Sequence, residues 1–289
     1  MRSGALITAL VVAIMAALAA PTGALALQFP PNLGRVVYAW NEKSPRIIYV
    51  IGVSHRDALT MGNGPETVKA QTEVYRIGQY LAGSGVQLLL PEGFFMANGV
   101  SADAAATPIR AVLTGAAAQT PTARPAAQLK EMFSASSRYV NAEMLLEKDL
   151  GFTLAQVEDP DLYQKELGLL KQAGQGDYFT MLNLQYLQLM RTARMLQQAP
   201  EVTDKEYSES LIKTKDAMMT MGLAHLKELI GFLNKGGINI EAPLFAPADY
   251  RDYSAGLNAA KLGYGIVVII PESLASNQAI LELTGLASR

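Results

Sequence analysis

Residues 47–55 read Ile-Ile-Tyr-Val-Ile-Gly-Val-Ser-His, and this stretch decides the fold. Its β-branched and aromatic side chains favour a strand that ends at Gly52. A second run of the same kind spans residues 36–40, and the polar residues 41–46 separate the two runs. This pattern predicts an N-terminal hairpin.

The residues that follow predict a strand, helix, strand unit. Apolar residues recur at helical spacing between 65 and 81, and Gly83 and Gly85 then stop the helix. Residues 86–90, Val-Gln-Leu-Leu-Leu, are short and apolar enough for a buried strand. Because two strands joined through a helix run parallel, we expect an α/β fold: a mixed, largely parallel sheet with an N-terminal hairpin and a helical insertion.

The insertion is expected around residues 100–200 of a single domain that spans 27–289. Ala, Thr and Pro dominate residues 101–128, which indicates a segment with little apolar content of its own. A strand at 152–157 is expected, followed by a long helix at 178–198. The Met and Leu side chains of that helix indicate core packing rather than a cofactor-binding motif.

The first unit recurs near the C-terminus. A strand at 217–221 leads into Gly222-Leu223-Ala224-His225, which matches the earlier Gly52-Val53-Ser54-His55. A helix at 226–234 and a further strand at 238–240 follow. Because the spacing from each histidine to the next glutamate differs, the internal repeat is weak.

The polar candidates for a functional site all follow predicted strands. His55, Glu92, Glu158 and His225 each come after such a strand, and ligands of open α/β sheets bind at the carboxyl ends of strands. These two histidines are the only ones in the chain, and each follows by three residues a glycine that would let the backbone turn tightly. One such histidine is more often structural than a ligand, but two in matched contexts favour a shared site.

The carboxylates have alternative roles. Glu92 is either solvated at a strand end or part of the site, and the site is preferred. For Glu158 a place in the site and a solvated position are evenly balanced. The residues that follow it, Asp-Pro-Asp at 159–161, are typical of an ordinary turn and helix cap. Ser54 is a poor nucleophile candidate, since the Gly-x-Ser-x-Gly elbow of serine hydrolases does not surround it.

Two imidazoles with one or two carboxylates suit a divalent metal such as zinc, manganese, cobalt or iron, and leave positions open for water. A metal held in this way lowers the pKa of its bound water, and a nearby carboxylate can accept the proton. The same residues could also hold a ligand without reaction.

Composition limits the class of protein. Half of the side chains are hydrophobic, 17% are charged and the net charge is −2, as in an ordinary globular protein. This balance gives no reason to expect nucleic acid as a partner. The chain has no cysteine, so disulfides cannot indicate its compartment.

The N-terminus predicts export. Arg2 precedes an apolar run at 6–20, and Ala24 and Ala26 fit the small-residue rule for signal cleavage. Residues 1–26 are therefore expected to be a signal peptide, and the mature protein to be periplasmic or secreted, with membrane contact only through that signal. An uncleaved anchor is the alternative, although the run is shorter than the ~20 residues that span a bilayer.

The two Gly-x-x-His motifs and the strand-end glutamate resemble the TraB/Tiki superfamily, which also includes erythromycin-esterase and ChaN-like proteins. The resemblance covers most of the mature chain, but the Ala/Thr/Pro-rich segment is outside its pattern. It implies an α/β sheet with a helical insertion and, in the Tiki branch, metal-dependent peptide hydrolysis by residues matching His55, Glu92 and His225. Members often carry an arginine on a helix before the second motif, which Arg191 or Arg194 would match; either is otherwise a solvated helix residue.

The leading hypothesis is an exported metal-dependent hydrolase of a peptide or ester bond in a peptide or small-molecule substrate. Its expected metal ligands are His55, His225, Glu92 and Glu158, and its expected catalytic residues are Glu92 and Arg194. The alternative is a non-enzymatic haem- or metal-binding envelope protein of the ChaN-like type, with these residues or tyrosines such as Tyr178 and Tyr186 as ligands. A third hypothesis is an exported scaffold with a degenerate site.

Overall fold

The structure is a computed structural model. It describes residues 29–54, 64–97, 100–101, 123–135, 140–173, 178–238, 240, 242–244, 246–249, 257–258 and 261–283. The predicted signal peptide, His55 and most of the Ala/Thr/Pro-rich segment lie outside these residues.

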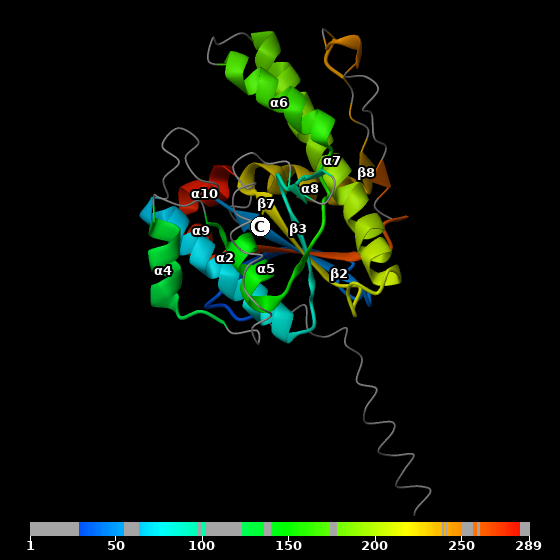
Figure 1. The fold of residues 1–289 in the computed structure, drawn as a ribbon. Helices are drawn as coiled ribbons and strands as arrows, with labels where there is room; N and C mark the ends of the chain where they lie inside the picture. Colours follow the sequence, from blue (N-terminus) through cyan, green and yellow to red (C-terminus); the bar gives the residue numbers. More distant parts are fainter. Residues whose placement is uncertain are drawn as a thin grey trace, which may run out of the picture.

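A central sheet organises the fold (Figure 1). Within the described residues it has six strands, in the spatial order β1 (Gly34–Trp40), β10 (Gly265–Pro271), β2 (Ile47–Val53), β7 (Ala217–Gly222), β3 (Leu88–Pro91) and β6 (Thr153–Leu154). β1 is antiparallel to β10, and the other neighbours are parallel. The predicted fold class, a mixed and largely parallel α/β sheet with a helical insertion, is confirmed.

The two N-terminal strands show how the sheet refines the prediction. β1 and β2 run in opposite directions and are joined by residues 41–46, as expected of a hairpin. They are not hydrogen bonded to each other, because β10 from the far end of the chain lies between them. Long-range pairing of the apolar β10 therefore completes the N-terminal part of the sheet.

The predicted strand at 238–240 does not extend the repeat. β8 (Gly237–Ile238) pairs with β9 (Leu257–Asn258) in a separate two-stranded ribbon, as β4 (Met96–Ala97) does with β5 (Val100–Ser101). The second copy of the repeat therefore lacks its last strand in the central sheet. The residue pattern of such a short strand does not show whether the strand joins the central sheet or pairs elsewhere.

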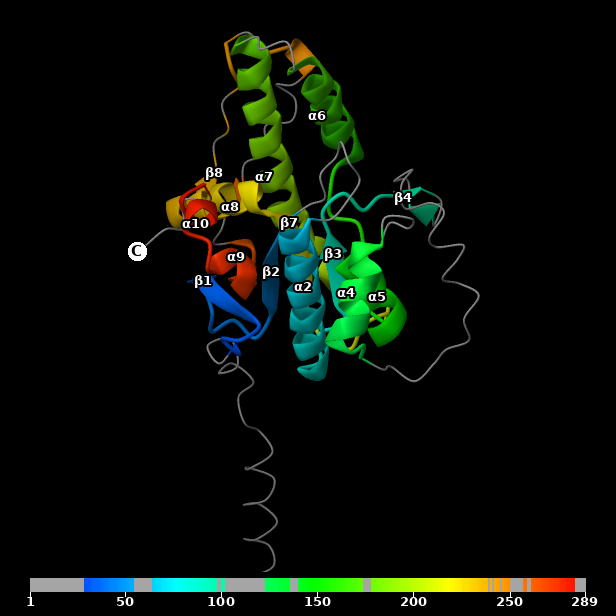
Figure 2. The same ribbon diagram turned by 90° about the vertical axis from the view of Figure 1, so that its left-hand side faces the viewer.

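Helices cover both faces of the sheet (Figure 2). In chain order they are α2 (Pro65–Gly83), α4 (Ala126–Ser134), α5 (Ala142–Leu150), α6 (Pro160–Ala173), α7 (Tyr178–Ser208), α8 (Leu223–Lys235), α9 (Glu272–Ala275) and α10 (Gln278–Leu283). On β2, Ile48 and Val50 pack into a core with α7 and α8, whereas Ile47 and Ile51 pack into a core with α2 and α5. The central strands are thus buried on both faces, which explains their continuous apolar sequence.

The long helix α7 extends beyond the predicted residues 178–198 and passes through Pro200 to Ser208. Its outer half packs beside α6, and together they project away from the sheet (Figure 2). Across the described part of the chain, we find no helix long and apolar enough to cross a membrane.

Candidate functional site

The candidate site lies at one edge of the sheet. Strands β2, β7, β3 and β6 are neighbours in that order and run parallel, so their carboxyl ends share this edge. Each end is followed by a residue predicted from the sequence: His55 after β2, His225 after β7, Glu92 after β3 and Glu158 after β6. His55 itself lies outside the described residues, but β2 is described to its end at Val53. Strand order therefore supports the predicted clustering.

Glu92 is held from three sides. Its Oε2 accepts a hydrogen bond of 2.5 Å from the backbone N–H of Gly222, at the end of the neighbouring strand. Its Oε1 lies 3.3 Å from Nε2 of His225 and 3.3 Å from Nη2 of Arg191. The side chain is 11% exposed. Its carboxylate is therefore fixed in orientation, with one oxygen facing the imidazole.

His225 lies in the first turn of α8, not in a turn before the helix. Its Nε2 faces Glu92, while its Nδ1 lies 2.6 Å from Oγ1 of Thr192 and 3.6 Å from Oε2 of Glu228. Thr192 donates a short hydrogen bond to Glu228. Both ring nitrogens of His225 are thus engaged.

Neither glycine of the Gly-x-x-His motifs has the positive φ angle that would require glycine in a tight turn. Gly222 has φ −57°, which is accessible to any residue. A Cβ atom on Gly52 would lie 2.8 Å from Cδ1 of Leu226 and 3.0 Å from Cδ2 of Leu223, both on α8. Close packing of α8 against β2, rather than a tight turn, therefore favours glycine at position 52.

Arg191 on α7 is the centre of a buried ion-pair network. Its guanidinium donates to Glu166 on α6 at 2.6 Å, to Glu158 through a very short contact, and to Glu92 at 3.3 Å. The side chain of Glu158 is fully buried, and its other oxygen accepts a hydrogen bond of 2.7 Å from the N–H of Gly93. Arg191 thus ties the helical insertion to the sheet edge.

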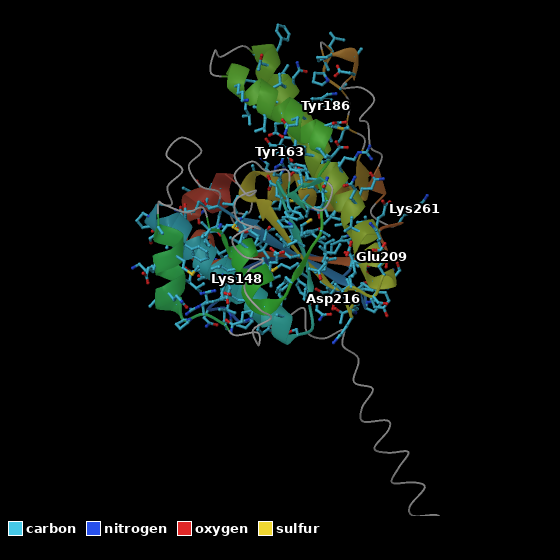
Figure 3. The ribbon with its side chains drawn as sticks, in the orientation of Figure 1. Lys148, Tyr163, Tyr186, Glu209, Asp216 and Lys261 are labelled. Atoms are coloured by element: carbon cyan, nitrogen blue, oxygen red, sulfur yellow. The ribbon has the colours of Figure 1, made fainter. Side chains whose placement is uncertain are left out.

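Aromatic side chains cover this network. The guanidinium carbon of Arg191 lies 5.1 Å from the ring centroid of Tyr163 on α6, and that ring packs against Phe95 at 4.8 Å. Figure 3 labels Tyr163, which is on α6, and Tyr186, which is on α7. Tyr186 is 3% exposed and Tyr178 is 69% exposed, so the two candidate haem ligands lie in opposite environments.

The charges of the site perturb the pKa values of its groups. Burial alone would lower the pKa of His225, but Glu92 and Glu228 outweigh it and raise the pKa to about 10. Burial also opposes the charge on Arg191, yet Glu158 and Glu166 hold its pKa above the ordinary value. Burial raises the pKa of Glu158 although Arg191 acts in the opposite direction.

The remaining predicted residue, Arg194, is not part of the network. It forms none of the ion pairs found among the described residues, and its Nε is buried there without a hydrogen-bond partner. Arg191, the other arginine considered, forms the ion pairs instead. Arg194 is one turn farther along α7, and position on a helix alone did not distinguish the two.

Three residues of the site were not predicted: Glu166, Thr192 and Glu228. Glu228 follows His225 by three residues, a spacing that places both on one helix face. The predicted helix began after His225, so this pairing was missed. Glu166 and Thr192 carried no sequence pattern, because they reach the site through packing of α6 and α7.

Within the part of the chain that the structure describes, no group of three or more histidine, aspartate and glutamate side chains is arranged to hold a metal. Two donor atoms do converge, Oε1 of Glu92 and Nε2 of His225, whereas the other predicted histidine ligand, His55, lies outside the described residues. This donor set suits a divalent cation. No protein-family model matches the chain, and comparisons with curated proteins and with solved structures found no match either.

Proposed function

We propose that this protein is an exported metal-dependent hydrolase of a peptide or ester bond, with its site at the carboxyl edge of the sheet. His225, Glu92 and His55 would hold the metal. One observation carries the proposal: Glu92 Oε1 and His225 Nε2 converge within a buried cluster that, among the described residues, has more carboxylates than cationic groups. The resemblance of the two Gly-x-x-His motifs to the TraB/Tiki superfamily is part of the proposal.

The charge balance favours a cation. The carboxylates of Glu92, Glu158, Glu166 and Glu228 surround one guanidinium and one imidazole, and each is at most 16% exposed. A histidine that binds a metal is neutral, so when all four carboxylates are ionised this cluster of described residues carries three more negative than positive charges. Excess negative charge is costly away from water, and a bound divalent cation would lower that cost.

The ligands are not all equivalent. Glu158 gives one oxygen to Arg191 and the other to the N–H of Gly93. We therefore assign Glu158 the role of holding Arg191, in place of the metal-ligand role expected from the sequence. Glu166 acts on Arg191 in the same way. Zinc, manganese and cobalt all accept the remaining nitrogen and oxygen donors.

The chain's own residues would prepare the reaction. When bound, the metal would supply a water of lowered pKa. The N–H of Gly222 and the guanidinium of Arg191 orient the carboxylate of Glu92 towards Nε2 of His225, where it would act as a metal ligand or as the general base. Tyr163 and Phe95 limit access of water to the guanidinium of Arg191.

Metal analysis tests the proposal directly. The purified mature chain is reconstituted with zinc, manganese or cobalt, and bound metal is measured by mass spectrometry. We expect one equivalent in the wild type and in Glu131→Gln, an exposed glutamate on α4, and loss of that metal in His55→Ala and His225→Ala. A wild type that holds none of the three metals would contradict the proposal.

Turnover separates the hydrolase from a metal-binding protein. The metal-loaded wild type should cleave members of a panel of fluorogenic peptides and esters, and Glu92→Gln should lower kcat by at least about 100-fold. Bound metal without cleavage of any substrate would instead favour the non-enzymatic alternative.

A further inference from the structure

Thr192 stands between His225 and Glu228, and its hydroxyl can orient the imidazole. Oγ1 of Thr192 lies 2.6 Å from Nδ1 of His225 and makes a very short hydrogen bond with Oε2 of Glu228. It also lies 3.0 Å from the carbonyl oxygen of Gln188, one turn earlier on α7. Thr192 is fully buried, so water does not compete for these contacts.

The proton count decides the direction of these bonds. A threonine hydroxyl has one proton and two lone pairs, whereas an ionised carboxylate only accepts. The carbonyl oxygen of Gln188 and the carboxylate of Glu228 both only accept, so they share the single proton of the hydroxyl, and the short, charge-assisted contact to Glu228 takes the larger part of it. The oxygen of Thr192 is then the acceptor for His225, and the proton of that bond resides on Nδ1.

We infer that Glu228, acting through the hydroxyl of Thr192, keeps a proton on Nδ1 of His225 and so leaves Nε2 as the atom that faces the site. Thr192 and Glu228 are thus positioning residues for His225. This inference rests on the proposed metal site for its functional meaning. Histidines that bind metals commonly donate their second ring N–H to a carboxylate or another acceptor, and loss of that partner weakens metal binding.

Cobalt binding tests the functional consequence. The mature protein is titrated with cobalt(II) alone, and the visible absorption of the bound ion is followed. Thr192→Val, which removes the hydroxyl at nearly constant volume, and Glu228→Leu should each weaken binding about 10- to 100-fold. Thr192→Ser, which restores the hydroxyl, and the surface control Glu131→Gln should bind within about 3-fold of the wild type. Unchanged affinity in Thr192→Val would overturn the inference.

Nuclear magnetic resonance of the ring protons tests the geometry without metal. With ¹⁵N-labelled histidine the chain has only two imidazoles, and His225→Gln assigns the signal of His225. We expect a low-field Nδ1–H resonance protected from solvent exchange in the wild type and in Thr192→Ser, and its loss in Thr192→Val. Persistence of that resonance in Thr192→Val would overturn the inference.

The two experiments distinguish the inference from the proposed function. If the wild type binds no cobalt, the metal site is wrong, and the ring-proton spectra still decide the role of Thr192. If cobalt binds equally well to the wild type and Thr192→Val, the metal site stands and the positioning role is wrong. Thermal unfolding of each variant shows whether a change in affinity reflects loss of the fold.

Discussion

Gly52 on β2 lies directly beneath Leu226 on α8, so close that a Cβ atom on the glycine would be 2.8 Å from Cδ1 of the leucine. Leu226 is fully buried and cannot move away into solvent. The contact therefore fixes how closely the helix that carries His225 approaches the strand that precedes His55.

Gly52→Ala should lower the free energy of unfolding by about 1–3 kcal/mol, because an added methyl group overpacks the interface between β2 and α8. Chemical denaturation measures the change. Gly83→Ala is the matched control: it lies in α2 with nothing within 4 Å of the new Cβ, and should raise stability by a few tenths to about 1 kcal/mol. Equal effects of the two substitutions would contradict the packing explanation.

Arg191→Met should lower the free energy of unfolding by about 3–5 kcal/mol, since it leaves the carboxylates of Glu92, Glu158 and Glu166 buried without their guanidinium. Burial already raises the pKa of Glu158 in the folded protein. Without Arg191 its folded pKa stays above the unfolded value, so protonation favours the folded state. The loss of stability should therefore shrink as the pH falls from about 8 to about 5 in urea unfolding.

Arg194→Met provides the comparison for Arg191→Met. The Nε of Arg194 is buried without a partner among the described residues, and methionine retains much of the apolar stem. We expect stability within about 0.5 kcal/mol of the wild type or above it, and unchanged cobalt affinity. Loss of metal binding or of turnover in Arg194→Met would restore the catalytic role expected from the sequence.

Asp204 should contribute stability that disappears in acid. Burial alone would raise its pKa, but hydrogen bonds from Lys215 and Tyr264 outweigh burial and hold it below its ordinary value of 3.8. Its folded pKa thus lies below the unfolded one, so its contribution is present above that ordinary value and is lost as the pH falls through the folded pKa.

The contribution of Asp204 to the free energy of unfolding should be small, at most about 1 kcal/mol. Its side chain is 43% exposed, so solvent screens its ion pair with Lys215. Guanidinium unfolding of wild type and Asp204→Asn between neutral pH and about pH 2.5 should show a difference that vanishes at the acid end. A difference that grows on acidification would show that the sign is wrong.

Much of the fold was predictable because its signals are local. Apolar runs between polar turns identified β2, β3 and β7, and helical spacing identified α2. The position of β10 was not predictable, because pairing between strands more than 200 residues apart depends on which edge remains free once the others have assembled.

The amino-acid sequence alone determined that Glu92, Glu158 and His225 follow strands. Because parallel strands end at the same edge of a sheet, these three side chains were expected to lie close together. Only the tertiary structure decided that Arg191 rather than Arg194 joins them and that Glu166 and Thr192 come from the helical insertion. The physical reason is that side chains on a helix reach a site only through its rotation and docking. Those are set by packing between segments distant in sequence, which no local pattern encodes.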